Sequence, residues 1–198
     1  MYITKHPEIA RIAEEAGVDW IFVDMEFIGK DCRQGGLDTV QNHHTVEDVA
    51  NIRAAVTKAK VLVRIDMIHI GLNDMHLALK MKFMFQLLTD GSVDKWTRII
   101  AQKGIMYGFG GLASLNGGAV PGRMILKEHY RLRSQMVIVS RAFCNTDNMT
   151  DLDKVRSIFN NGIADIRKME NEMNKLSKED FKNNHKAVCD AVGIIVKK

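Results

Sequence analysis

The chain has 198 residues, of which 46% are hydrophobic, so it is long enough to bury one substantial core. Its 28 basic and 24 acidic residues give a formal net charge of +4 and are spread along the chain, which argues against a nucleic-acid-binding surface. No apolar run approaches the roughly 18 residues of a membrane span, and residues 1–10 lack the apolar core of a signal peptide. We therefore expect one domain, residues 1–198, in a cytoplasmic protein that binds neither nucleic acid nor membrane.

The three cysteines indicate a reducing compartment. Cys32, Cys144 and Cys189 are odd in number, far apart, and in no CxxC or zinc-type spacing. We expect them to be free thiols.

The first 28 residues predict a strand, a helix and a second strand. A short strand at 2–4 precedes a helix that Pro7 opens and Gly17 ends. The next apolar stretch ends in two carboxylates, Asp24 and Glu26. These carboxylates therefore lie at the carboxyl end of the predicted strand, where ligands bind in α/β folds.

A polar, glycine-containing loop is predicted at 29–44, at about 16 residues longer than most connections and therefore a candidate for a function. Thr45 is a good cap for a following helix with apolar residues at helical spacing.

Residues 61–76 form the most regular run in the chain. Eight of the twelve residues in 61–72 are Val, Ile, Leu or Met, which is typical of a strand buried on both faces. Arg64 interrupts this run, and an arginine inside an apolar strand is expected to meet a carboxylate, a phosphate or a ligand because an unpaired buried charge is costly. Asp74 follows the run, again at the predicted carboxyl end of a strand.

The rest of the chain continues the alternation of strands and helices. Residues 76–88 predict a loop or an irregular helix, and Gly108 to Gly111 predict a tight turn after a strand at 105–109. The remaining predictions are helices at 92–103, 121–131, 150–173 and 177–196, and a strand at 136–139. Such alternation with short connections indicates a parallel sheet, either a barrel or a doubly wound layer.

Several segments resemble the HpcH/HpaI aldolase and citrate lyase family. They are IAEEAGVDWIFVDME at 12–26, VLVRI at 61–65, IHIGLNDMHL at 68–77 and, more loosely, GFGGLA at 108–113. The resemblance implies an α/β fold of the TIM-barrel type and a divalent metal, Mg²⁺ or Mn²⁺. It also implies a carbon–carbon lyase that acts on a 2-oxo acid or an acyl-CoA-linked hydroxy acid through a pyruvate-type enolate, whose charge the metal stabilises.

The resemblance assigns roles to four residues. Asp74 matches the carboxylate metal ligand of the family's I-G-x-x-D motif, and Arg64 matches the arginine that contacts the substrate's oxo and carboxylate oxygens. Asp24 and Glu26 match acidic residues that position water or a general base. Glu26 is also the best candidate for a second metal carboxylate beside Asp74.

The chain departs from the family pattern in two places. Many family members have a histidine base directly after the glutamate, whereas this chain has Phe27; His43 and His44 are alternative sources of an imidazole. A complete TIM barrel needs eight strands and about 250 residues, whereas we predict five or six strands and long C-terminal helices. Our hypothesis is an internal deletion near residues 65–66, which removes the family's second metal carboxylate.

The sequence also allows simpler interpretations. Asp74 also suits a helix cap or an Asx-turn after a strand, and Arg64 also suits an ion pair with Asp24 or Glu26. The apolar stripes of the two C-terminal helices suit either homo-oligomerisation or packing within the chain. The alternative to an enzyme is a catalytically inactive, oligomeric remnant of the fold.

Overall fold

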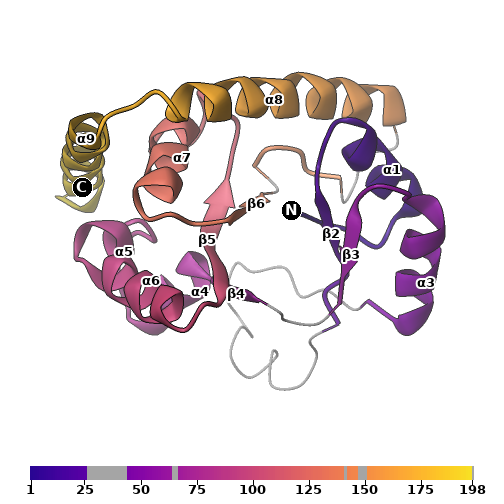
Figure 1. Ribbon diagram of the computed structural model, residues 1–198, viewed down its shortest axis with the longest axis horizontal. Coiled ribbons are helices and arrows are strands. Elements are labelled where there is room, and N and C mark those ends of the chain that lie inside the picture. Colours follow the sequence, from indigo (N-terminus) through magenta and orange to yellow (C-terminus); the bar gives the residue numbers. More distant parts are fainter. Residues whose placement is uncertain (26–43, 64–66, 141, 147–150, 198) are drawn as a thin grey trace. The chain divides into compact units, whose positions relative to one another are not determined.

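The computed structural model describes residues 1–25, 44–63, 67–140, 142–146 and 151–197 (Figure 1). The chain divides into two compact units, and each is described by itself. Unit 1 comprises Met1–Ile65 and Cys144–Ile163, and unit 2 comprises Asp66–Phe143 and Ala164–Lys198.

Unit 1 contains a parallel three-stranded sheet with two helices. The strands, in the order β1-β2-β3, are β1 (Tyr2–Ile3), β2 (Trp20–Phe22) and β3 (Lys60–Leu62). Helix α1 (Pro7–Glu15) connects the first two strands, and α3 (Val46–Ala55) precedes the third and packs against α1. Each helix therefore belongs to a connection between parallel strands, as the sequence pattern predicts.

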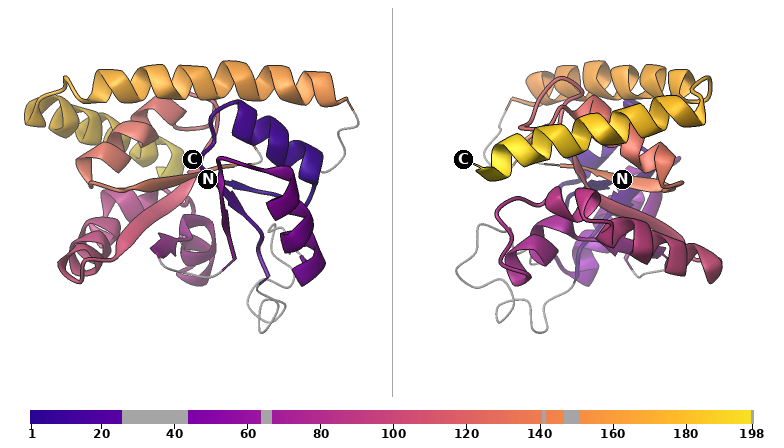
Figure 2. Two further views of the ribbon diagram at one scale, coloured as in Figure 1. Left: turned by 45° about the vertical axis from the view of Figure 1, so that its right-hand side comes forward. Right: turned by 90° about the vertical axis from the view of Figure 1, so that its left-hand side faces the viewer.

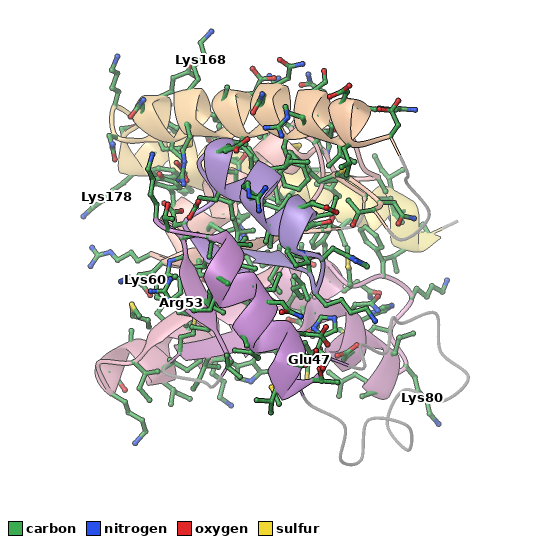
Figure 3. All side chains as sticks on the ribbon, turned by 90° about the vertical axis from the view of Figure 1, so that its right-hand side faces the viewer. Glu47, Arg53, Lys60, Lys80, Lys168 and Lys178 are labelled. Atoms are coloured by element: carbon green, nitrogen blue, oxygen red, sulfur yellow. The ribbon has the colours of Figure 1, made fainter. Side chains whose placement is uncertain are left out.

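Local signals explain where these helices begin and end. Pro7 starts α1, and the chain leaves this helix through Gly17, whose φ of +96° favours glycine. Thr45 forms a capping box with Asp48 at the start of α3. Figure 3 shows Glu47 and Arg53 toward opposite ends of α3, an arrangement that complements the helix dipole.

Unit 2 contains the second parallel sheet, in the order β4-β5-β6. Its strands are β4 (Met67–Ile70), β5 (Met106–Leu112) and β6 (Met136–Val139). The central strand β5 packs against the helices α4, α6 and α7. The helices of this unit are α4 (Leu72–Ala78), α5 (Gln86–Thr89), α6 (Ser92–Gln102), α7 (Gly122–Arg131) and α9 (Lys178–Lys197).

Helix α8 (Leu152–Met173) carries the apolar stripe that the sequence predicts. Both views in Figure 2 show α8 as one continuous helix and α9 as a second long helix. Most side chains of the α8 stripe are buried, although Leu152 at its start is 40% exposed, and the ring of Phe159 packs edge-on against Tyr2 with a centroid distance of 5.0 Å. The buried positions are Val155, Phe159, Ile163, Ile166, Met169 and Met173. This stripe is therefore covered within the single chain.

The expected TIM-barrel-type fold is wrong, although the α/β class and the long C-terminal helices are as predicted. The six strands among the described residues form two separate three-stranded parallel sheets and no closed barrel. Closure requires every edge strand to pair with a neighbour at a consistent tilt and stagger. Here β3 and β4, which follow each other in the chain, are each an outer strand of a different sheet.

The run at 61–72 is not one strand. Strand β3 ends at Leu62 and β4 begins at Met67, and α4 already begins at Leu72. The boundary between the two units falls between Ile65 and Asp66, where the sequence suggests a deletion. The deletion itself stays a prediction.

The expected tight turn at Gly108 to Gly111 is also wrong, because these glycines belong to β5. A Cβ atom on Gly108 would meet the Met136 carbonyl oxygen of β6 at 2.3 Å. The register between β5 and β6 shifts between Gly108 and Gly111, and Gly110 has a φ of +54°. The glycines thus permit β5 and β6 to approach closely and to pair irregularly, as glycine often does where a strand carries a bulge.

Among the described residues, no helix is both long enough and apolar enough to cross a membrane.

Candidate functional site

A cluster of polar side chains lies just past the carboxyl end of the unit 1 sheet. Asp24 follows β2 by two residues and is 7% exposed, and His44, directly before the cap of α3, is 4% exposed. The carboxylate of Asp24 is close enough to act on the imidazole electrostatically. The structure therefore brings together one buried carboxylate and one buried histidine.

Backbone contacts fix the chain on both sides of this cluster. Thr4 follows β1, donates its backbone N–H to the Phe22 carbonyl oxygen at 3.2 Å, and accepts the His6 backbone N–H on Oγ1 at 3.1 Å. The Val23 backbone N–H donates to the Leu62 carbonyl oxygen at 3.0 Å. These bonds continue the ordering of the sheet up to Asp24.

The α3 capping box positions His44. Thr45 donates its backbone N–H to Asp48 Oδ2 at 2.8 Å, and its own Oγ1 accepts the Asp48 backbone N–H at 3.2 Å. Because the backbone immediately after His44 is held by these reciprocal bonds, the imidazole enters the cluster from a rigid helix start.

His44 is poised as a neutral imidazole. Burial lowers its pKa, the carboxylates of Asp24 and Asp48 raise it in part, and Lys5 and His6 lower it further, with a net lowering. Its Nδ1 atom is buried and has no hydrogen-bond partner among the described residues. A neutral histidine next to a carboxylate is the usual arrangement of a general base, since the carboxylate stabilises the imidazolium that forms.

Asp74 lies in unit 2, in the first turn of α4, which begins directly after β4. Its side chain is exposed, and its Oδ2 lies 3.4 Å from the position that a Cβ on Gly71 would take. An acidic residue here also favours the helix through its dipole. Asp74 is therefore not the helix cap that the sequence allows, because Gly71 is the N-cap of α4, and its role as a metal ligand stays a prediction.

The described residues only partly fit a metal site. Mg²⁺ accepts one or two carboxylates completed by water and substrate, so the oxygen of Asp74 is a suitable type of ligand. However, the described part of the chain contains no group of three or more His, Cys, Asp or Glu side chains that could hold a metal ion.

The other predicted site residues cannot be placed. Arg64 and Glu26 lie outside the described residues, as do Phe27, His43 and most of the loop predicted at 29–44. The sequence offers His44 only as an alternative source of an imidazole, together with His43, and does not predict that it lies beside Asp24. The signal that could have favoured His44 over His43 is its position directly before the Thr45 cap.

Comparisons of the chain with protein-family models, with curated proteins and with solved structures gave no match. The resemblance to the aldolase and citrate lyase family therefore stays a prediction from the sequence.

Proposed function

We propose that the protein is a metal-dependent carbon–carbon lyase of the aldolase and citrate lyase type, acting on a 2-oxo acid or a related hydroxy acid. The observation that carries the proposal is the buried pair of His44 and Asp24 past the carboxyl end of β2. Forming and quenching a pyruvate-type enolate requires a base that removes a proton from the carbon beside the oxo group. A neutral histidine with a carboxylate neighbour supplies that base.

In this proposal His44 accepts the proton, and Asp24 stabilises the imidazolium that results. Water is kept from the imidazole because the side chain is buried. By the sequence resemblance, Arg64 would hold the substrate's oxo and carboxylate oxygens, and Asp74 with Glu26 would hold Mg²⁺ or Mn²⁺. The metal, when bound, would supply a Lewis acid for the oxo oxygen.

Exchange of the pyruvate methyl protons with D₂O, followed by NMR in the presence of Mg²⁺ or Mn²⁺, tests proton transfer without knowledge of the second substrate. We expect exchange by the parent protein and a loss of about 10²–10⁴-fold in His44→Gln, the usual contribution of a general base. His6→Gln is the matched control, because it removes a nearby exposed imidazole and should leave the exchange unchanged. No exchange by the parent, or equal exchange by His44→Gln, would contradict the assignment.

Metal binding is tested separately by calorimetric titration of Mg²⁺ or Mn²⁺ with pyruvate present. We expect Asp74→Ala to lose the binding that the parent shows, whereas Asp90→Ala, at the end of α5, should retain it. A parent protein that binds neither metal nor pyruvate would remove the enzyme proposal.

A second candidate is a catalytically inactive homo-oligomer. It is favoured by the two separate sheets and by the lack of a three-ligand metal group among the described residues. A mass in solution of two or more times 22.4 kDa, together with no exchange and no metal binding, would select this candidate. A monomer that catalyses exchange would eliminate it.

A further inference from the structure

Three side chains of unit 2 form a connected set that the proposed lyase does not use. His185 and Cys189 lie one turn apart on α9, and Glu128 lies on α7, the helix against which α9 packs. The Cys189 sulfur is 3.7 Å from Nε2 of His185, and Nδ1 of His185 is 2.9 Å from Oε2 of Glu128. A thiol, an imidazole and a carboxylate are thus joined in series.

The carboxylate is firmly held. Glu128 is fully buried, and its Oε2 accepts the Nε–H of Arg131 at 2.8 Å while its Oε1 accepts Nδ2–H of Asn184 at 2.9 Å. The guanidinium of Arg131 also binds both oxygens of Asp94 on α6, at 2.6 and 2.9 Å. Glu128 is therefore fixed by partners from two helices.

This arrangement determines the tautomer of His185. Because Oε2 of Glu128 acts as an acceptor toward Arg131, Nδ1 of His185 must be the donor in the bond to the same oxygen. In the neutral ring, Nε2 then carries a lone pair, and it faces the Cys189 sulfur. The imidazole can thus accept the proton of the thiol, the relation between nucleophile, base and orienting acid that general-base catalysis requires.

The set is accessible from solvent. The His185 side chain is 30% exposed, and Cys189 is partly exposed, whereas Cys144 is buried. We propose that Cys189, His185 and Glu128 form a nucleophilic thiol site that reacts with small, uncharged carbon electrophiles. Charge sets the preference for an uncharged reagent, because the acidic groups acting on the sulfur are Glu128, Asp94 and Asp190, and the basic one is Arg131.

The step conserves atoms and electrons. With iodoacetamide as the probe, the sulfur–carbon bond forms while the carbon–iodine bond breaks, iodide leaves, and the thiol proton passes to Nε2 of His185. Burial and the carboxylates of Glu128 and Asp190 raise the pKa of the Cys189 thiol, so near neutral pH the sulfur is protonated before the attack. The reaction therefore depends on the imidazole as the proton acceptor.

The test is the rate of alkylation of Cys189, measured by peptide mass spectrometry on the folded full-length chain near neutral pH. We expect His185→Gln to react about 100-fold more slowly than the parent, the lower end of the range for general-base catalysis. The alkylation rates of the parent and of His185→Gln should converge as the pH rises, because the thiol then ionises without transferring its proton to His185. In the parent, the preference for iodoacetamide over the anionic iodoacetate should exceed that of a free cysteine.

The matched control is Lys182→Gln. It removes the exposed ion pair of Lys182 with Glu179 on the same helix, but it leaves the thiol, the imidazole and the carboxylate of Glu128 in place. We expect its alkylation rate to stay within about threefold of the parent rate, a much smaller change than the loss of a general base causes. Equal rates in the parent and His185→Gln, or equal losses in both variants, would show that the cluster is only a structural ion-pair network.

A second measurement needs no variant. If the thiol proton moves to His185 during the attack, alkylation of the parent is slower in D₂O than in H₂O near neutral pH. A rate that is not reduced in D₂O would overturn the proposal, even where the His185→Gln chain fails to fold.

Discussion

At the scale of single residues, Glu14 shows how one side chain can replace a missing backbone partner. Its Oε1 accepts three consecutive backbone N–H groups before β3, those of Thr57, Lys58 and Ala59, at 2.8, 2.6 and 2.7 Å. Partial burial raises the pKa of Glu14, but these N–H groups and the Lys58 charge lower it more. The carboxylate of α1 therefore organises the loop that leads into β3.

We predict that Glu14→Gln lowers the free energy of unfolding by about 1–3 kcal/mol, the usual cost of weakening hydrogen bonds to a charged group. The lowered pKa means that this stabilisation is present at neutral pH and is lost as the pH falls and the carboxyl is protonated. Denaturant unfolding of the parent and the variant at neutral pH measures the difference.

The neighbouring Glu15 provides the control. It forms an exposed ion pair with Arg156, and exposed pairs contribute only about 0–1 kcal/mol. Glu15→Gln should therefore cost less than Glu14→Gln. The reverse order would contradict the role given to the three N–H donors.

At the scale of elements, local signals in the sequence predict helices better than strands. The Thr45 cap, the Pro7 start and Gly104 after α6 each mark a helix end through chemistry within one turn. The sequence predicts a turn at the glycines of β5, whereas Gly108 is required by the carbonyl oxygen of Met136, which is 28 residues away in the chain. A contact at that separation leaves no local pattern.

Substitution of Gly108 by alanine tests this explanation of β5. We predict a loss toward the upper end of about 1–3 kcal/mol in the free energy of unfolding, because the new methyl group would overlap the Met136 carbonyl oxygen and force β5 and β6 apart. Thermal or denaturant unfolding measures the loss.

Gly193 in α9 is the matched position, since a Cβ there meets nothing within 4 Å. Gly193→Ala is expected to stabilise the protein by about 0.5–1 kcal/mol through the helix preference of alanine. If Gly108→Ala were as well tolerated as Gly193→Ala, the close strand approach would not be the reason for the glycine.

At the scale of the whole molecule, the sequence predicts the parallel α/β class but not how the strands assemble. The pattern shows that Asp24 and Asp74 follow strands, because alternation and length are local properties. It does not show that β3 and β4 belong to different sheets, since strand pairing is decided by long-range contacts. For the same reason, the sequence left the choice of imidazole open, and the burial of His44 beside Asp24 became visible only in the fold.

Global stability should fall in mild acid because of two histidines in unit 2. The ring of His129 stacks on Phe109 at 3.9 Å, its Nδ1 bonds to Ser134 at 2.9 Å, and its buried Nε2 has no partner among the described residues. Burial lowers the pKa of His129 to about 3 and that of His69 to about 4, the second partly offset by the Gly110 carbonyl. Both rings are therefore neutral in the folded protein at neutral pH.

The sign of the effect follows from the lowered pKa values. The unfolded chain takes up these protons at about pH 6.5, but the folded chain takes them up only near pH 4 and pH 3, so their contribution is complete above about pH 6.5 and is lost on acidification. At pH 5 each histidine lowers the free energy of unfolding by roughly 2 kcal/mol. Denaturant unfolding at pH values between 7.5 and 5 should show this decline in the free energy of unfolding, roughly 2 kcal/mol for each histidine.

The double variant His69→Gln and His129→Gln separates this effect from the titration of other groups. It lowers stability at neutral pH, but the decline between pH 7.5 and pH 5 should become smaller by roughly 4 kcal/mol, since glutamine does not titrate. Part of the slope should remain, because burial lowers the pKa of His44 as well. An unchanged slope in the double variant would mean that the two imidazoles take up protons in the folded protein as readily as in the unfolded chain, contrary to their burial beneath Phe109 and beside Gly110.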